Sequence, residues 1–170
     1  MTNETVDTPQ ELGPGLVEFV FVMTEAEYRM VREGAVLSDL TENDFVRQSI
    51  SDADFFDDLR RQGGRIRAVR NGKMYREKVV GGSTFRGALR AMVSRNSPSA
   101  PALVERAAIV TDHEFSLLQR GAALSGLSDN DYLLGAISDA RFRRGKIAEG
   151  FSIRVLQGEV LYRVLDTPTR

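Results

Sequence analysis

The chain has 170 residues, of which 42% are hydrophobic and 28% are charged, and its formal net charge is −1. This composition is typical of a soluble globular protein, and the length fits one ordinary domain or two small ones. Cysteine is absent, which excludes disulfide bonds and thiolate metal sites and agrees with the reducing cytoplasm in which we expect the protein to act.

The first segment, residues 1–16, is polar and has no basic-then-apolar signal pattern, so we expect a flexible tail there and another at residues 167–170. The most apolar stretch, Leu16 to Met23, is interrupted by Glu18 and is far too short to span a bilayer. We therefore expect no membrane partner.

Two segments of the chain, residues 17–79 and 104–166, are similar to one another. A shift of 87 residues aligns them without a gap and gives 21 identities in 63 positions. The run Ile50-Ser51-Asp52-Ala53, for example, recurs as Ile137-Ser138-Asp139-Ala140. The sequence therefore predicts a tandem duplication of one folding unit. Residues 80–103 are expected to form a basic linker that contains a short helix.

Each copy begins with a short apolar strand, Val17 to Met23 in the first and Val104 to Val110 in the second. A capping box follows, Thr24-x-x-Glu27 or Thr111-x-x-Glu114, and predicts the start of a helix because its two side chains satisfy the first unpaired amides. A second helix is expected to begin at Thr41 or Ser128, where a hydroxyl is again followed by a carboxylate.

A third helical turn or helix is expected to restart at Ser51 and Ser138, before a terminating glycine. A hairpin over residues 65–79 or 152–165 then closes each copy. Its predicted turn is Asn71-Gly72 in the first copy and Gln157-Gly158 in the second. The predicted fold is α+β: two β-α-α-β-β units, packed about a pseudo-two-fold axis through their first strands, with the hairpins as C-terminal additions.

The order of strand, helix, polar turn and capped helix is clearest in Val110-Thr111, Gly126-Leu127-Ser128-Asp129-Asn130-Asp131-Tyr132 and Ala136-Ile137, and residues 39–45 match it in the first copy. It resembles the ribbon-helix-helix family of bacterial repressors, antitoxins and plasmid-mobilisation accessory proteins, over about 35 residues of each copy. In that family, strands from two subunits pair into a ribbon that lies in the DNA major groove. The resemblance implies a DNA-binding pseudo-dimer, with a ribbon-helix-helix-like core, made by one chain.

The strand departs from that family. A base-reading face uses Arg, Lys, Asn or Gln, whereas the first strand offers only Glu18 and the second only Glu105 and Arg106. We therefore expect the strands to be buried on both faces, and we do not carry over the DNA contacts of the family.

The hairpin is the better candidate for binding nucleic acid. Its two-residue turn places Arg67 opposite Arg76 and Arg65 opposite Lys78, on the face away from the expected core. Like charges in direct opposition destabilise a strand pair unless an anion lies on them. The second copy has arginines at two of the equivalent positions, Arg154 and Arg163, also on the outer side. The candidate nucleic-acid-binding residues are Arg65, Arg67, Arg70, Lys73, Arg76, Lys78, Arg154 and Arg163.

Charge is strongly segregated along the chain: residues 1–59 contain 14 acidic and 3 basic side chains, and residues 60–95 contain 11 basic and 1 acidic. This asymmetry favours double-stranded DNA as the partner of a transcriptional regulator or antitoxin-like protein. Three alternatives stay open. The acidic and basic thirds could neutralise each other within the fold or across a homodimer. The protein could be an interaction or assembly module whose acidic third or basic hairpin binds a protein, or it could sense a small molecule.

No pattern indicates catalysis. The single histidine, His113, lies beside a helix cap and lacks partners for a zinc site. The aspartates at 52, 54, 57 and 58 lack the glycine and distal glutamate of a calcium loop. Nucleophile-elbow and phosphate-loop motifs are absent from the sequence. We expect a non-enzymatic protein with no metal and no cofactor.

Overall fold

The structure is a computed structural model that describes residues 12–74, 102–157 and 160–166. The element order is β1 (Leu16–Thr24), α1 (Glu25–Ser38), α2 (Glu42–Arg61), β2 (Gly64–Arg70), β3 (Lys73–Met74), β4 (Leu103–Thr111), α4 (Asp112–Ser125), α5 (Asp129–Ala148), β5 (Ser152–Gln157) and β6 (Val160–Asp166). Within these residues, no helix is both long enough and apolar enough to cross a membrane.

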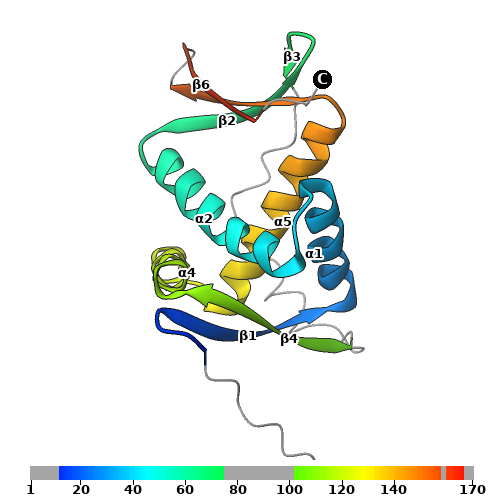
Figure 1. Cartoon of the computed structure of the whole chain (residues 1–170). Helices are drawn as coiled ribbons and strands as arrows, with labels where there is room; N and C mark the ends of the chain where they lie inside the picture. The colour runs from blue at the N-terminus through cyan, green and yellow to red at the C-terminus, as the bar shows by residue number, and fades with distance from the viewer. Residues whose placement is uncertain (1–11, 75–101, 158–159, 167–170) are drawn as a thin grey trace, which may run out of the picture.

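Three layers make up the described molecule. The strands β1 and β4 pair as an antiparallel two-stranded ribbon at the lower end of Figure 1. Four helices occupy the middle, and a second sheet with strand order β3-β2-β5-β6 lies at the upper end. The α+β class predicted from the sequence is confirmed, and the linker expected at residues 80–103 falls mostly outside the described residues.

A pseudo-two-fold axis relates the two halves of the chain. The bounds of β1, α1 and α2 recur in β4, α4 and α5 at a shift of 87 residues. Equivalent residues also face each other across both sheets, Val20 opposite Ala107 in the ribbon and Arg67 opposite Arg154 in the second sheet. The axis therefore passes through the first strands, as predicted, and also through β2 and β5. The tandem duplication as an event remains a prediction from the sequence.

The helix starts are those that the sequence predicts. Both capping boxes form, with the hydroxyls of Thr24 and Thr111 accepting from the amides three residues later. The restart expected at Ser51 is wrong, because α2 runs unbroken over 20 residues. The Ser51 hydroxyl donates to the carbonyl of Arg47, one turn earlier, so it is accommodated within the helix and does not cap a new one.

The core lies between the ribbon and the helices. Phe21, Met23, Ala108 and Val110 point inward from the ribbon and meet buried residues of all four helices. Apolar surface of this extent is the main stabilising contribution to such a fold. The ribbon is packed on one side only, however. Its other face is solvent-exposed, with Val20 50% exposed, so the prediction of strands buried on both faces is wrong.

Two asparagines tie the helices to the free edges of the ribbon. Asn130, in the first turn of α5, accepts from the Val22 amide at 2.7 Å and donates to the Val22 carbonyl at 3.0 Å. Asn43, in the first turn of α2, makes the equivalent pair of bonds with Ile109 at 2.8 and 3.0 Å. Each asparagine belongs to the half opposite to the strand it binds. These bonds satisfy edge groups that a two-stranded ribbon would leave unpaired.

The hairpins join into one sheet because β2 pairs with β5, a pairing that the sequence did not predict. The Asn71-Gly72 turn is confirmed: both residues have positive φ, at 50° and 73°, and Arg70 pairs with Lys73. The turn predicted at Gln157-Gly158 is displaced, because Gln157 is a strand residue paired with Val160.

Candidate functional site

The second sheet carries the predicted basic residues. Along β2, Arg65, Arg67 and Val69 alternate with residues that point to the opposite face, and across β5 they stand opposite Leu156, Arg154 and Ser152. We call this surface, made of these six residues, the arginine face. Arg65 is exposed, and Arg67 and Arg154 are half-buried.

Arg67 and Arg154 are opposed on the pseudo-two-fold axis. Side chains in this relation have Cβ atoms about 4.5–5.5 Å apart, so two positive charges are held together. Arg67 donates from Nη1 to the Ile66 carbonyl at 3.1 Å. The Nε of Arg154 is buried and has no hydrogen-bond partner. Neither arginine, nor Arg65, forms an ion pair with a carboxylate of the described residues.

The remaining candidates do not all join this face. Arg70 points to the other side of the sheet, where its guanidinium lies 5.9 Å from the centre of the Phe151 ring, beside Gly150 at the end of α5. Lys73 lies opposite Arg70 at the hairpin end. Arg76 and Lys78 fall outside the described residues. Arg163 is described only as a strand position, and register shifts in β6 set it opposite Val155 instead of Arg154.

Several carboxylates of the acidic first third pair with arginines of the helices. Asp52 binds Arg143 at 3.1 Å, and Glu33 binds Arg141 with Nε to Oε2 at 2.9 Å. Burial lowers the pKa of Arg143, and the charge of Asp52 opposes that effect. The acidic and basic thirds therefore neutralise each other only in part among the described residues: Arg60 and Arg61 pair with Asp57 and Asp58, whereas Arg65 and Arg67 form no ion pair with a described carboxylate. No carboxylate within residues 12–74, 102–157 and 160–166 forms an ion pair with the arginines of the arginine face.

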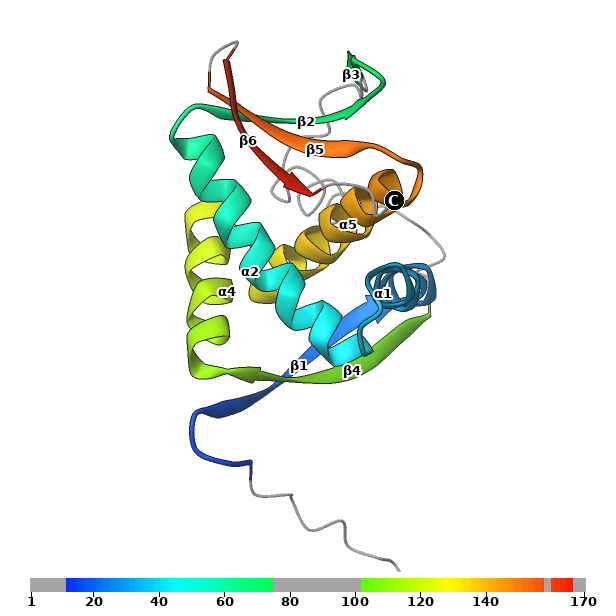
Figure 2. The same ribbon diagram turned by 45° about the horizontal axis from the view of Figure 1, so that its top comes forward.

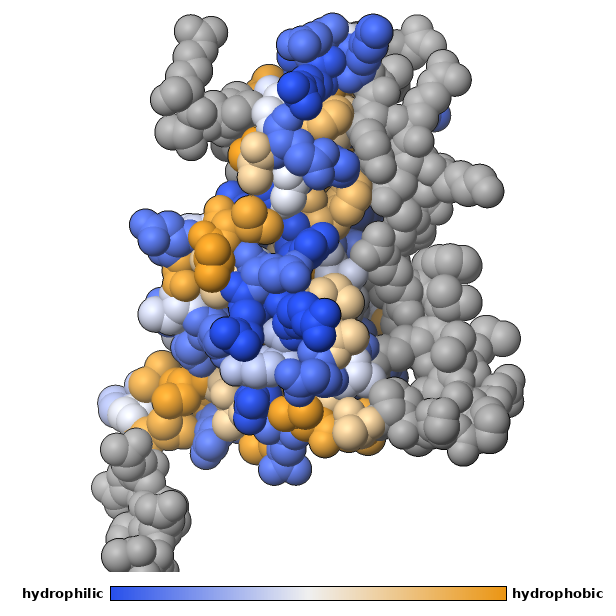
Figure 3. All heavy atoms as spheres, turned by 90° about the vertical axis from the view of Figure 1, so that its right-hand side faces the viewer, coloured by the Kyte–Doolittle hydropathy of each residue, from blue (hydrophilic) through white to orange (hydrophobic). Residues whose placement is uncertain are grey.

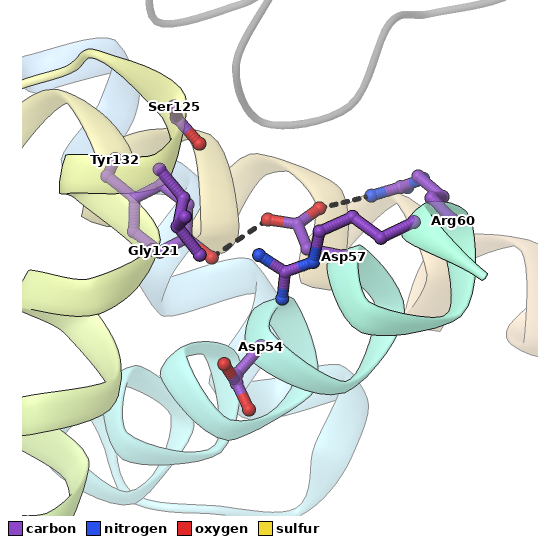
Figure 4. Close-up of a pocket in the computed structure, with 8 residues that line it drawn as sticks. Asp54, Asp57, Arg60, Gly121, Ser125 and Tyr132 are labelled. Carbon is purple, nitrogen blue, oxygen red and sulfur yellow. Dashed lines mark hydrogen bonds and ion pairs between the residues drawn. The ribbon is translucent and has the colours of Figure 1, made fainter.

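A pocket of about 320 Å³ opens between α2, α4 and the start of α5 (Figure 4). The Tyr132 hydroxyl donates to Asp57 at 2.9 Å, and Arg60 donates to the same carboxylate at 2.7 Å. Burial, then the charge of Asp57, raises the pKa of Tyr132, so the phenol keeps its proton. The pocket is lined by Asp54, Asp57, Arg60, Arg61, Gly121, Leu124, Ser125 and Tyr132.

This pocket has the size of a small ligand site, but its polar groups already bind one another. Asp57 holds two donors, and Asp54 pairs with Arg120. The sequence predicted Tyr132 only as a core residue, and no local signal indicated its bond to a carboxylate 75 positions away. Elsewhere in the described ranges, no group of three histidine, aspartate or glutamate side chains is placed to hold a metal ion.

The exposed face of the ribbon is apolar and acidic. Val20 and Ala107 lie at its centre, and Glu18 and Glu105 flank them at equivalent positions, both exposed. Hydrophobic spheres gather along the lower edge of the molecule in Figure 3, the end at which Figure 1 shows the ribbon. Carboxylates on this face would repel phosphates, so it does not resemble a DNA-reading surface.

Comparisons with known proteins leave the family open. No protein-family model matches the chain. No curated protein matches it significantly, and neither does any solved structure.

Proposed function

We propose that the protein is a non-enzymatic DNA-binding regulator that binds the phosphate backbone through the arginine face. The observation that carries this proposal is the opposed pair Arg67 and Arg154, two guanidinium groups on one sheet face without an ion pair to any described carboxylate, together with the buried Arg154 Nε, which has no hydrogen-bond partner. Arginine binds phosphate oxygens with short, charge-assisted bonds. An anion on this face would remove the repulsion that the strand pairing creates.

The proposal includes a ribbon-helix-helix-like core. It is supported by the pairing of the first strands and by two hydroxyl-capped helices that follow each of them. The ribbon itself is not proposed as the DNA surface, because its exposed side offers Glu18 and Glu105. The binding surface is instead the sheet at the opposite end of the axis, and such a regulator would act in the cytoplasm.

Salt dependence tests the proposal. Each arginine that binds a phosphate contributes about 0.9 to the slope of log affinity against log salt concentration. The variant Arg67→Ala/Arg154→Ala should therefore reduce that slope by about 2 and weaken binding at about 50 mM salt by tenfold or more, measured by fluorescence anisotropy on a duplex of about 20 base pairs.

The matched control is Arg29→Ala/Arg32→Ala, which removes the same charge from the exposed side of α1. It should leave the slope nearly unchanged. If the two double variants bind alike, or if the wild-type protein leaves the duplex free at micromolar concentration, the arginine face is not a nucleic-acid site.

A second candidate, a protein-interaction or assembly module, is favoured by the exposed apolar centre of the ribbon at Val20 and Ala107. Val20→Lys would abolish concentration-dependent self-association if the ribbon is such an interface. Light scattering at increasing protein concentration distinguishes this candidate from the DNA-binding regulator. Val20→Lys would reduce the association, whereas Arg67→Ala/Arg154→Ala would leave it unchanged.

A further inference from the structure

Two contacts between the halves occupy equivalent positions but carry exchanged charges. Glu33 on α1 binds Arg141 on α5, with Nε to Oε2 at 2.9 Å. At a shift of 87 residues, the partner contact joins Arg120 on α4 to Asp54 on α2. One half is therefore acidic at both positions, and the other half is basic at both. Figures 1 and 2 show the helix pairs α1–α5 and α2–α4 on which these contacts lie.

This exchange makes the interface selective. If the first half paired with another copy of itself in the same geometry, Glu33 would face Asp54 twice. If the second half did so, Arg120 would face Arg141 twice. Only the pairing of unlike halves gives attraction at both contacts, and like-charge contacts at an interface act against the wrong partner.

A second, independent observation lies on the axis. Phe56 and Arg143 are equivalent residues, and the Arg143 guanidinium sits 4.0 Å from the centre of the Phe56 ring, with only 7% of the residue exposed. Asp52 binds the same guanidinium at 3.1 Å. Two copies of the second half would instead bring two Arg143 side chains together in a buried place. Asp139, the equivalent of Asp52, would still supply a carboxylate to each Arg143 there, so the cost would come from two adjacent guanidinium groups and from the lost contact with the Phe56 ring.

We infer that the interface between the halves is heterotypic: each half accepts only the opposite half, whether from its own chain or from a second copy, and rejects its own kind. A second copy can therefore enter the core only by exchanging unlike halves. The two strands of the ribbon, and the two hairpin strands β2 and β5, are then always contributed by one half of each type.

Full-length variants of matched charge composition test this inference. Both carry Arg143→Phe, so that the axis holds phenylalanine on both sides. In the first, Asp54→Arg/Arg141→Asp makes both contacts between unlike halves repulsive and makes each half complementary to itself. In the control, Glu33→Arg/Arg141→Glu also makes each half complementary to itself but keeps both contacts between unlike halves attractive, so the two variants differ only in the repulsion between unlike halves.

The first variant should form a dimer whose fraction rises with concentration, by light scattering, with the helical circular dichroism of the wild type. Its unfolding midpoint at low concentration should lie about 4 °C below that of the control. The control should keep the mass distribution of the wild type. Equal masses and equal midpoints for the two variants would overturn the inference.

A fourfold variant tests the inference if the first variant does not fold. Adding Glu33→Arg and Arg120→Asp to it reverses all four charges and restores attraction between unlike halves at unchanged net charge. Recovery of the native circular dichroism and wild-type mass supports a heterotypic interface. A fourfold variant that stays unfolded shows that these charges do not select the partner.

Discussion

Two glycines allow the two helices of each half to pack closely, α1 on α2 and α4 on α5, and replacing them tests the core most directly. A Cβ placed on Gly34 would lie 2.1 Å from Cζ of Phe45, and one on Gly121 would lie 2.2 Å from Cζ of Tyr132. Ordinary carbon contacts are about 3.5–4.0 Å, so each ring would have to move by more than 1 Å. Phe45 is 1% exposed and Tyr132 is fully buried, so either ring moves only at the expense of the contacts that it makes in the core.

Overpacking of this kind costs about 1–3 kcal/mol, and here the overlap involves a whole ring, whereas alanine gains about 1 kcal/mol of helix propensity over glycine. We expect Gly34→Ala and Gly121→Ala each to lower the free energy of unfolding by about 2 kcal/mol, which corresponds to a midpoint about 4–8 °C lower in a chain of this size. Thermal unfolding followed by circular dichroism measures the shift.

The matched control is Gly145→Ala in α5, where an added Cβ meets nothing within 4 Å. It should raise the midpoint by about 2–4 °C. A double variant, Gly34→Ala/Phe45→Leu, should lose less stability than the sum of its single changes because the smaller side chain relieves the overlap. If Gly34→Ala stabilises the protein as Gly145→Ala does, the ring is free to move and the close approach is not a constraint.

Three further outcomes follow from the described contacts. Glu18→Gln/Glu105→Gln should leave duplex affinity within about twofold at fixed salt, whereas a severalfold rise would show that the ribbon contacts DNA. Burial would raise the pKa of Glu114, but hydrogen bonds to its carboxylate outweigh that and hold the pKa below 4.5. The ionised Glu114 carboxylate therefore contributes its full stabilisation above pH 4.5, and this contribution is lost as the pH falls through the pKa of Glu114 in the folded protein. Between about pH 5 and 3, the free energy of unfolding, measured by denaturant titration, should fall less for Glu114→Gln than for the wild type. Asn43→Ala and Asn130→Ala should each cost about 1–2 kcal/mol and speed amide exchange at the ribbon edge they bind, and unchanged exchange would contradict that role.

The features that the sequence predicted correctly are those encoded within a few residues. The hydroxyl of Thr24 and the carboxylate of Glu27 form a cap wherever a helix follows, and Asn71-Gly72 supplies two residues that tolerate positive φ. The restart at Ser51 failed because the same hydroxyl that caps a helix can also bond within one. Local sequence patterns therefore predict where a helix begins more reliably than where it ends.

Local sequence patterns did not predict the contacts between the halves. The pairing of β2 with β5 places Arg67 directly opposite Arg154, and like charges in this relation destabilise a strand pair. The heterotypic contacts were visible in principle, because alignment of the halves shows Glu33 against Arg120 and Asp54 against Arg141. Identities between the copies predict the duplication, whereas the charge reversals at these four positions indicate which half pairs with which. Those become meaningful only once both members of a contact are known.

The axis also bears on how a duplex would be contacted. Arg67 and Arg154 are equivalent and would meet DNA alike, but the counterpart of Arg65 is Ser152. A backbone site with two-fold symmetry would therefore find a guanidinium on one side of the axis and a hydroxyl on the other. Because the halves accept only each other, the inequality cannot be removed by pairing two halves of one kind. Phosphate contacts would then be stronger on the side of the first half. The protein would therefore bind even a palindromic duplex in a preferred orientation, because its own two sides differ.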